Sequence, residues 1–273
     1  MTDHYAVIGN PIAHSKSPRI HAAFASQTRQ DIHYDRILVE PGQLAAAVEH
    51  FRKAGGKGLN ITVPFKNDAF ALATSMTERA QLAGAVNTLV INEDGSLHAD
   101  NTDGVGLVRD LTINHGFNLK ASRVLLLGAG GAVQGVLLPL LEQKPAEIVI
   151  ANRTIEKAQA LCEKFSDYGK LSACGFAELA GKQFDGIING TAASLQGEVP
   201  PLPDNVMSSA GWCYDMMYSN EPTAFVRWGN DHGAATSVDG LGMLVEQAAE
   251  SFTLWRSVRP ETKPVISLLR EAG

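Results

Sequence analysis

This chain of 273 residues has little of several features that would assign it to a specialised class. Its three cysteines, Cys162, Cys174 and Cys213, are odd in number and far apart, which argues against a disulfide framework and against a thiolate metal site. We therefore expect reduced thiols, no metal ion and a cytoplasmic location. Residues 1–9 show no basic segment and no cleavage-like pattern, so no secretory leader is expected.

Long apolar runs and blocks of one charge are also missing. The most apolar stretch, residues 136–141, is much shorter than the roughly 20 residues that a membrane helix needs. Basic residues are scattered and the formal net charge is −6, which gives no reason to expect nucleic-acid binding. We expect no membrane and no nucleic-acid partner. The length fits one large domain or two ordinary ones.

What the chain does contain is a regular alternation of strand-like and helix-like segments. This pattern is typical of an α/β fold with mainly parallel sheets. In the first hundred residues, strands are expected at 5–8, 32–39 and 57–62, and helices at 18–26 and 42–54. Residues 87–92 and 97–100 flank a cluster of turn-forming residues, so they are expected to form a hairpin at the edge of the first sheet.

A glycine-rich turn lies between two short apolar runs, residues 124–127 and 148–151. The turn reads Gly128-Ala129-Gly130-Gly131-Ala132, and the order strand, turn, helix, strand is typical of a dinucleotide site. Such a turn brings backbone N–H groups to a pyrophosphate at a helix N-terminus. The second run ends in Asn152-Arg153-Thr154, where an NAD site usually carries an acidic residue. A guanidinium suits a 2′-phosphate, so Arg153 favours NADP(H).

Taken alone, the glycine-rich turn is weak evidence, because an ordinary βαβ turn can share it. The third position of the G-x-G-x-x-G spacing is Val133, neither Gly nor Ala. The flanking apolar runs and Arg153 favour the nucleotide interpretation. Lys157 is either a second phosphate contact or a solvated lysine of the following helix.

The second half of the chain continues the alternation and then becomes helical. A helix from Gly104 to about His115 is expected to lead into the nucleotide domain, whose later strands are expected near 148, 171, 186–188, 212–217 and 234–237. After Gly240, apolar and polar residues that include Gln247 and Ser251 share one helical face. A last helix is expected at 263–270. Neither helix has a strand partner, so both are expected to return to the first domain.

Nucleotide binding does not define a reaction, so the chemistry must come from polar residues of the first domain. Three clusters follow its expected strands: Ser15-Lys16-Ser17-Pro18, Asn60-x-Thr62-Val63-Pro64-Phe65-Lys66 and Asp100-Asn101-Thr102-Asp103-Gly104. With Gly9-Asn10-Pro11-Ile12, Gly84-Ala85-Val86-Asn87-Thr88, the nucleotide motifs, Tyr214-Asp215-Met216-x-Tyr218 and Asp239-Gly240-x-Gly242-Met243, they resemble the shikimate dehydrogenase family. The resemblance spans nearly the whole chain.

The resemblance implies a reversible, NADPH-dependent reduction of 3-dehydroshikimate to shikimate in aromatic amino-acid biosynthesis. It also implies two α/β domains. Residues 1–103, completed by 240–273, would form the substrate-binding and catalytic domain, and residues 104–239 a Rossmann-type NADP-binding domain.

By the same resemblance, Lys66 and Asp103 are the catalytic pair. Hydride delivery to a ketone develops negative charge on its oxygen, which a nearby ammonium can stabilise and protonate. We expect Lys66 to donate this proton, and Asp103 to hydrogen-bond Lys66 and a substrate hydroxyl. Alone, Lys66 would more simply be a solvated lysine at a helix start and Asp103 a helix N-cap. Only their joint occurrence favours catalysis.

Seven neutral side chains are assigned to the substrate by the resemblance. Ser15, Ser17 and Tyr218 are expected to bind its carboxylate, and Asn60, Thr62, Asn87 and Gln247 its ring hydroxyls. Directional hydrogen bonds from such groups offset the desolvation of a polyol. For each serine on its own, a turn or cap role is the simpler alternative.

Near the nicotinamide, the resemblance places Met216, Gly240 and Met243, for which core and turn roles are the alternatives. The chain departs from the family pattern in two places. Val133-Gln134 stand where Ser-Arg is usual, which removes one possible phosphate contact, and Ala192 replaces a serine in the segment Asn189–Ser194. The second departure leaves the contacts beside the nicotinamide open.

Two other functions are also compatible with the sequence. One is a quinate/shikimate dehydrogenase with NAD or mixed cofactor use, and the other is a non-enzymatic NADP(H)-binding sensor. Arg153 argues against NAD, and the presence of both Lys66 and Asp103 argues against a pure binder. The expected partner is a small-molecule substrate, and the expected assembly is a monomer or homodimer.

Overall fold

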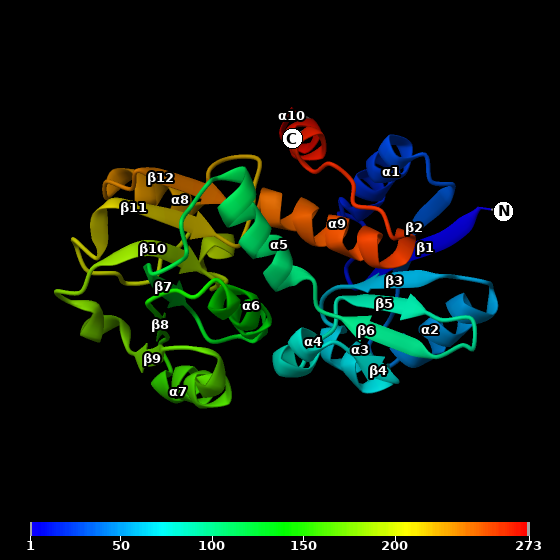
Figure 1. Cartoon of the computed structure of the whole chain (residues 1–273), viewed down its shortest axis with the longest axis horizontal. Coiled ribbons are helices and arrows are strands. Elements are labelled where there is room, and N and C mark those ends of the chain that lie inside the picture. The colour runs from blue at the N-terminus through cyan, green and yellow to red at the C-terminus, as the bar shows by residue number, and fades with distance from the viewer. Residues whose placement is uncertain (1, 272–273) are drawn as a thin grey trace. The chain divides into compact units, whose positions relative to one another are not determined.

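A computed structural model describes residues 2–271 of the chain. These residues form two compact units: the first holds the chain up to Gly106 and from Val245 onward, and the second holds Leu107–Leu244. The chain passes from one unit to the other inside two helices, α5 (Asp103–Arg109) and α9 (Leu241–Arg256). Each unit contains a sheet flanked by helices (Figure 1), so the predicted α/β fold class is confirmed.

The first unit is built on a mixed sheet of six described strands in the order β2-β1-β3-β5-β6-β4. Its strands are β1 (Asp3–Gly9), β2 (Ile32–Leu38), β3 (Gly58–Ile61), β4 (Ser75–Met76), β5 (Thr88–Ile91) and β6 (Leu97–Asp100). Its helices are α1 (Ser17–Thr28), α2 (Leu44–Lys53), α3 (Lys66–Leu72), α4 (Glu78–Ala83), most of α9, and α10 (Lys263–Glu271).

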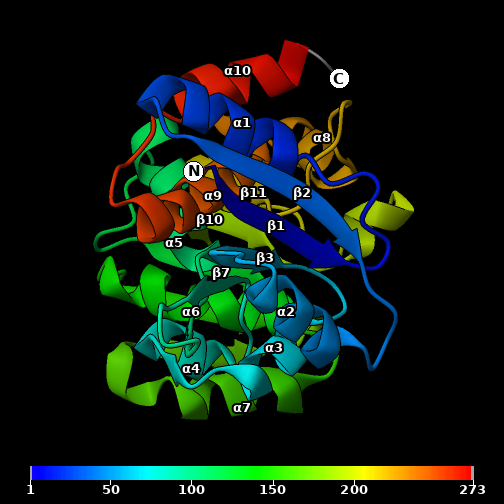
Figure 2. The ribbon, with the colours of Figure 1, turned by 90° about the vertical axis from the view of Figure 1, so that its right-hand side faces the viewer.

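Both faces of the sheet are covered at its centre, where every residue of β3 is buried. Along β1, Ala6 and Ile8 belong to a core cluster with Leu44 of α2 and Ala69 of α3. The alternate side chains of β1 pack on the other face, where the Tyr5 ring stacks on Trp255 of α9 at 4.7 Å. Figure 2 shows β2, β1 and β3 side by side. The predicted return of the C-terminal helices to this unit is confirmed.

One sequence prediction for this sheet is wrong. The hairpin of β5 and β6 is antiparallel as expected, but it does not lie at the edge, because β4 pairs with β6 beyond it. The strand β4 has only two residues, too few to show a periodicity in the sequence. It is held in place by its neighbour Thr74, whose backbone N–H and hydroxyl both donate to the Leu97 carbonyl.

The second unit contains a fully parallel sheet in the order β12-β11-β10-β7-β8-β9, the doubly wound arrangement of dinucleotide-binding domains. Its described strands are β7 (Arg123–Leu127), β8 (Glu147–Ala151), β9 (Leu171–Cys174), β10 (Phe184–Asn189), β11 (Met207–Asp215) and β12 (Thr236–Asp239). Its α-helices are α6 (Gly131–Glu142), α7 (Ile155–Lys164) and α8 (Ala224–Asp231), with short 3-10 turns at Ser166–Tyr168, Phe176–Leu179 and Ala193–Gln196.

The helix expected from Gly104 to His115 is not uniform. The α-helix α5 ends at Arg109, and a single π-helical turn, Asp110–Asn114, follows it. The Asp110 side chain is buried and accepts a hydrogen bond from the Tyr214 hydroxyl at 2.6 Å. Among residues 2–271, no helix combines the length and apolar character needed to span a bilayer.

Candidate functional site

Lys66 and Asp103 form an ion pair in the first unit. The Lys66 Nζ donates to the Asp103 Oδ2 over 2.5 Å, and the two side chains remain 28% and 17% exposed. Lys66 is the first residue of α3 and Asp103 the first of α5, so each stands where a loop enters a helix. A backbone hydrogen bond from Val86 N to Lys66 O ties the α3 start to the loop before β5. The two residues are thus side by side and reachable from solvent.

The second oxygen of Asp103 is bound by the Asn87 amide, which donates over 2.8 Å. The amide orientation of Asn87 is fixed, because its Oδ1 accepts from the backbone N–H of Thr102 at 2.9 Å. The same Asn87 Nδ2 lies 3.3 Å from the Gln247 Oε1 of α9. Lys66, Asn87, Asp103 and Gln247, all predicted from the sequence, therefore converge at one place.

Asn60 joins this cluster through side chains that sequence reasoning missed. Its Nδ2 donates to the Ser251 Oγ at 3.0 Å and to the Thr88 Oγ1 at 3.2 Å. Thr88 in turn donates to the Asn87 Oδ1 at 2.9 Å. Ser251 carried a usable signal, since it falls one helical turn after Gln247 on the predicted face of α9. Thr88 belongs to the family motif at residues 84–88, but no binding role was expected of it.

Ser15 and Ser17 lie at the start of α1. The Ser17 backbone N–H donates to the Ser15 Oγ at 3.3 Å, and Arg36 of β2 holds the Ser15 carbonyl with two hydrogen bonds. The Ser17 side chain is buried. Thr62 follows β3 and accepts, through its carbonyl, the hydrogen bond that forms the turn into Phe65 and Lys66. Thr62 thus begins the turn that ends at Lys66, the first residue of α3.

A buried ion pair holds the strand that leads to Asp103. The Arg79 guanidinium binds both oxygens of Asp100, at 2.7 and 2.6 Å, and Asp100 is only 1% exposed. The Thr77 hydroxyl donates to the same carboxylate, and so does the backbone N–H of Asn101. Arg79 also reaches Glu250 of α9 at 3.1 Å. Neither Arg79 nor this role of Asp100 was predicted from the sequence.

In the second unit, the glycine-rich turn joins β7 to α6. Gly128 has a φ of +101°, a conformation that favours glycine, and its N–H donates to the Ala151 carbonyl. A side chain built on Gly130 or Gly131 would have no heavy atom of the described residues within 4 Å, so this side of the backbone is open. An open glycine turn at the N-terminus of a twelve-residue helix is a fitting place for a pyrophosphate.

Val133, which stands at the third position of the glycine spacing, packs against Gly190. Val133 is fully buried, and a Cβ on Gly190 would lie 2.4 Å from its Cγ2. Gly190 follows β10, the strand next to β7, so the bulk of Val133 is accommodated by the missing side chain at Gly190. The helix therefore still approaches the sheet closely despite a branched residue at the third position of the glycine spacing.

Arg153 lines a hollow of about 330 Å³ in the second unit. Its other lining residues follow β8, β9 and β10 and include Asn152, Phe176, Thr191, Ala192, Ala193 and Pro200. Among residues 2–271, the Arg153 guanidinium has no hydrogen-bond or ionic partner, and its side chain is exposed. An unpaired guanidinium at such a hollow fits a phosphate. Lys157 is exposed on α7 and is not among the lining residues, and Thr154 is the exposed N-cap of that helix.

Met216 and Gly240 are brought together at the ends of β11 and β12. The Met216 N–H donates to the Asn189 carbonyl, and the Gly240 N–H to the Met217 carbonyl. Met243 follows one turn into α9 and is buried. Tyr218 lies in the same unit, and burial, with a smaller contribution from Asp239, raises the pKa of its hydroxyl. Tyr218 thus belongs to the second unit, whereas the two serines grouped with it belong to the first.

A buried carboxylate organises the segment that contains Ala192. Asp215 accepts from the Ser194 and Thr223 hydroxyls, both at 2.6 Å, and from the Asn189 amide at 3.0 Å. Burial raises the pKa of Asp215, and these donors oppose the shift. Asn189 also accepts from Thr191. The loop after β10 is therefore anchored by Ser194, two residues beyond the serine that Ala192 replaces.

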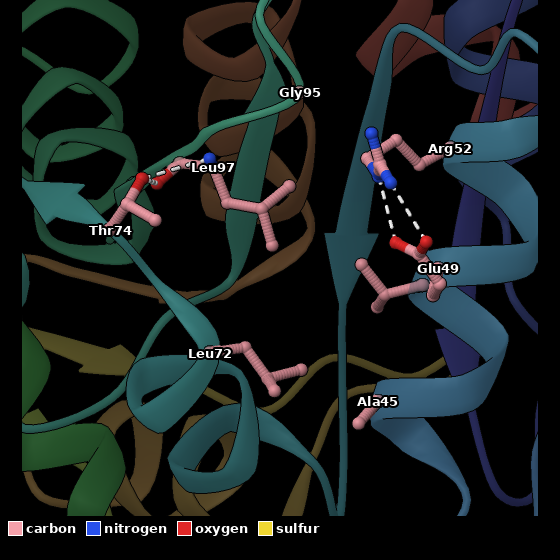
Figure 3. A pocket seen from close by; sticks show the side chains of 8 residues that line it. Ala45, Glu49, Arg52, Leu72, Thr74, Gly95 and Leu97 are labelled. Atoms are coloured by element: carbon pink, nitrogen blue, oxygen red, sulfur yellow. Dashed lines mark hydrogen bonds and ion pairs between the residues drawn. The ribbon is translucent and has the colours of Figure 1, made fainter.

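A separate hollow of about 200 Å³ lies on the α2 side of the first unit (Figure 3). Its polar groups satisfy one another: Arg52 donates to both oxygens of Glu49, and Thr74 bonds to Leu97. None of the predicted site residues lines it. No group of three His, Cys, Asp or Glu side chains within residues 2–271 is arranged to hold a metal ion.

Comparison with known families gives three matches along the chain. Residues 7–89 match the shikimate dehydrogenase substrate binding domain, residues 111–196 the shikimate / quinate 5-dehydrogenase model, and residues 240–270 the shikimate 5'-dehydrogenase C-terminal domain. This chain belongs to the shikimate dehydrogenase family. Together the matches cover most of the sequence, although the motifs at 100–104 and 214–218 lie between the matched ranges.

Two relatives show how close the similarity is. The shikimate dehydrogenase (NADP(+)) of Alkalilimnicola ehrlichii is 60% identical over 270 residues, which is 99% of each chain. That of Cellvibrio japonicus is 58% identical over 99% of this chain and 98% of the relative.

Two solved structures agree with the fold. An Ael1 enzyme from Pseudomonas putida aligns with a TM-score of 0.94 at 48% identity, covering 98% of both chains. A shikimate 5-dehydrogenase from Thermus thermophilus, solved in complex with NADP(H) and shikimate, aligns with a TM-score of 0.88 at 30% identity over 100% of both chains.

Proposed function

We propose that this chain is an NADP(H)-dependent shikimate dehydrogenase, which reversibly reduces 3-dehydroshikimate to shikimate in the shikimate pathway of aromatic amino-acid biosynthesis. The observation that carries the proposal is the Lys66–Asp103 ion pair, with Asn87 and Gln247 beside it. A protein that only bound NADP(H) would have no need of a partly exposed ammonium–carboxylate pair within a cluster of neutral amides.

Lys66 and Asp103 have different roles in the reduction. Bound NADPH supplies the hydride. Lys66 then stabilises the negative charge that develops on the ketone oxygen and gives that oxygen a proton. Asp103 keeps the ammonium in place through its Oδ2, and Asn87 holds the other oxygen, so the carboxylate cannot turn away from the lysine. Asp103 also accepts a hydrogen bond from a substrate hydroxyl.

The neutral side chains bind the rest of the substrate. Asn60, Thr62, Asn87 and Gln247 pair with ring hydroxyls, and Ser15, Ser17 and Tyr218 donate to the carboxylate. Because most of these groups are already held by hydrogen bonds to neighbours, they are ordered before the substrate arrives.

The cofactor is assigned to the second unit. Gly128, Ala129, Gly130, Gly131 and Ala132 would hold the pyrophosphate, and Asn152, Arg153 and Thr154, with Lys157 near them, the 2′-phosphate side of the adenosine. Met216, Gly240 and Met243 would line the nicotinamide. We further propose a cytoplasmic location, a monomer or homodimer, and no nucleic-acid partner.

Replacing Lys66 by alanine tests this function. The Lys66→Ala variant should lose about a hundredfold or more of kcat for shikimate oxidation, since positioned acid–base groups contribute roughly 10²–10⁴ in rate. The KM for shikimate should change much less. Lys53→Ala is the matched control, because Lys53 is a 71% exposed helix lysine paired with surface Glu49.

Three measurements decide the outcome: circular dichroism for the fold, and initial rates with shikimate and with NADP+ varied in turn. A folded Lys66→Ala variant that turns over like the wild-type chain would remove Lys66 from the mechanism. A wild-type chain that does not oxidise shikimate at all would remove the proposed function itself.

A further inference from the structure

Tyr34 is a buried tyrosine whose hydroxyl reaches a predicted substrate-binding side chain. It lies on β2 and is 9% exposed. The hydroxyl donates to the Asn60 Oδ1 at 2.7 Å, although β1 separates β2 from β3 in the sheet. Burial raises the pKa of Tyr34 well above its ordinary value, and a neighbouring Ser17 hydroxyl partly offsets this. Tyr34 therefore stays protonated and remains a donor.

Hydrogen bonds on both sides of the Asn60 amide fix how it is oriented. The Asn87 backbone carbonyl can only accept, and it takes a hydrogen bond from the Asn60 NH₂ group at 3.2 Å. The Asn60 oxygen therefore faces β2, where the Tyr34 hydroxyl donates to it. The NH₂ group then faces Thr88 and Ser251, which accept from it at 3.2 and 3.0 Å. With its orientation reversed, Asn60 would place an oxygen against the Asn87 carbonyl and against two hydroxyls whose protons are donated elsewhere, that of Thr88 to the Asn87 Oδ1 and that of Ser251 to the Gln247 carbonyl.

From Asn60 the donors continue in one direction toward the proposed catalytic carboxylate. Thr88 accepts from Asn60 and donates to the Asn87 Oδ1 at 2.9 Å. Asn87 donates to the Asp103 Oδ1 at 2.8 Å. The sequence Tyr34, Asn60, Thr88, Asn87, Asp103 is thus an ordered row of donors that ends at the partner of Lys66. Such a row strengthens each of its bonds and resists rotation of any one amide.

The Tyr34 ring is itself held in place by His21 of α1. The two rings stack with centroids 4.2 Å apart and planes 7° apart. His21 is completely buried, neither ring nitrogen has a hydrogen-bond partner among residues 2–271, and burial lowers its pKa to about 3 against a smaller opposing effect of Asn60. The ring is therefore neutral near neutral pH. His21 thus contacts Tyr34 through ring stacking and takes no part in the hydrogen-bonded row.

We propose that Tyr34 is a positioning residue for substrate binding, which holds the orientation of the Asn60 amide and, through Thr88, supports Asn87 and Asp103. The inference rests on the proposed function, because the effect is read out with shikimate. Tyr34 touches neither substrate nor cofactor in this scheme and acts through Asn60, with the Ser17 hydroxyl as its other polar neighbour.

Tyr34→Phe removes the hydroxyl and keeps the ring that stacks on His21. The kcat/KM for shikimate should fall about tenfold, mainly through a higher KM, because one buried acceptor loses its donor. The KM for NADP+ should stay the same. Tyr5→Phe is the matched control: Tyr5 pairs with Tyr34 across the strands, and its buried hydroxyl bonds to Arg256 at 3.3 Å, away from Asn60. It should leave both KM values unchanged.

Thr88→Val interrupts the same row at a residue with no proposed contact to substrate. It should raise the KM for shikimate, and its effect should not add to that of Tyr34→Phe in the double variant, since both break one row. This variant also carries the test if Tyr34→Phe does not fold. Thermal unfolding of each variant shows whether a change in KM is accompanied by a loss of stability.

Several results would overturn the inference while leaving the proposed function intact. These are a wild-type KM for shikimate in folded Tyr34→Phe, an equal KM increase in Tyr5→Phe, or additive effects of Tyr34→Phe and Thr88→Val. If the wild-type chain itself fails to oxidise shikimate, the proposed function is wrong, and the unchanged orientation of Asn60 can still be checked by NMR of its side-chain amide.

Discussion

At the scale of single residues, one guanidinium decides which cofactor the second unit should prefer. Arg153 is exposed, lines the hollow beyond β8 and has no partner within the described residues. A neutral 2′-hydroxyl gains little from such a group, whereas a phosphate gains charge-assisted hydrogen bonds. Gln134 of α6 carries no charge, so it adds nothing to this preference beside Arg153.

Reversing the charge at this position should therefore reverse the preference. In Arg153→Asp, the KM for NADP+ should rise roughly a hundredfold relative to that for NAD+, since charge-assisted hydrogen bonds contribute about 1.5–3 kcal/mol each. The measurement is kcat/KM for the two cofactors at saturating shikimate. Lys164→Asp makes the same charge change at the far end of α7 and should not alter the ratio.

Lys157→Asp tests whether Lys157 contacts the phosphate or is a solvated lysine of α7. Lys157 does not line the hollow, so we expect a much smaller shift in cofactor preference than for Arg153→Asp. An unchanged preference in Arg153→Asp would contradict the phosphate assignment.

A residue's role could be predicted from the sequence when a family motif assigns it, and not when it depends on a distant hydrogen bond. Lys66, Asp103, Asn87 and Gln247 were predictable because their motifs identify the family, and the structure brings them together. The roles of Tyr34, Thr88 and Arg79 were not, because the part that each plays depends on a partner distant in the sequence. Hydrogen bonds between residues 21 to 28 positions apart leave no local pattern in a sequence.

At the scale of elements, periodicity located the regular strands and helices and failed at short or irregular ones. The hairpin of β5 and β6 was predicted from its turn residues, but the two-residue β4 beside it was not. The helix after Asp103 was predicted as one piece, whereas it changes to a π-helical turn where the Asp110 side chain bonds Tyr214. Such changes depend on tertiary contacts, and π-helical turns often accompany functional regions.

The ion pair between Arg79 of α4 and Asp100 of β6 should stabilise the first unit. Arg79→Met should lower the free energy of unfolding by about 3–5 kcal/mol, because it leaves the buried Asp100 carboxylate without its cation. Arg52→Met is the control with the same two-point geometry, since Arg52 binds both oxygens of the half-exposed Glu49. Its stability should barely change.

Urea unfolding of both variants measures the difference. Equal losses would show that burial of Asp100 does not govern the energy of its pair. A much larger loss in Arg79→Met would show that the segment leading into Asn101, Thr102 and Asp103 depends on a buried charge.

At the scale of the whole molecule, the two units divide the proposed labour. The first unit holds the acid–base pair and most of the substrate residues, and the second holds the glycine turn, Arg153 and the three residues assigned to the nicotinamide. The fold class and the family could be predicted from the sequence because strand–helix alternation and motif order are properties of the linear chain. The individual roles of the site residues remain predictions.

One steady-state experiment tests the central claim most directly: initial rates of the purified wild-type chain with shikimate and with quinate, each in the presence of NADP+ and of NAD+. We predict that kcat/KM is highest for shikimate with NADP+, because Arg153 favours the 2′-phosphate and the amide cluster favours the shikimate hydroxyls. Preferred oxidation of quinate with NAD+, or no turnover of either substrate with either cofactor, would contradict it.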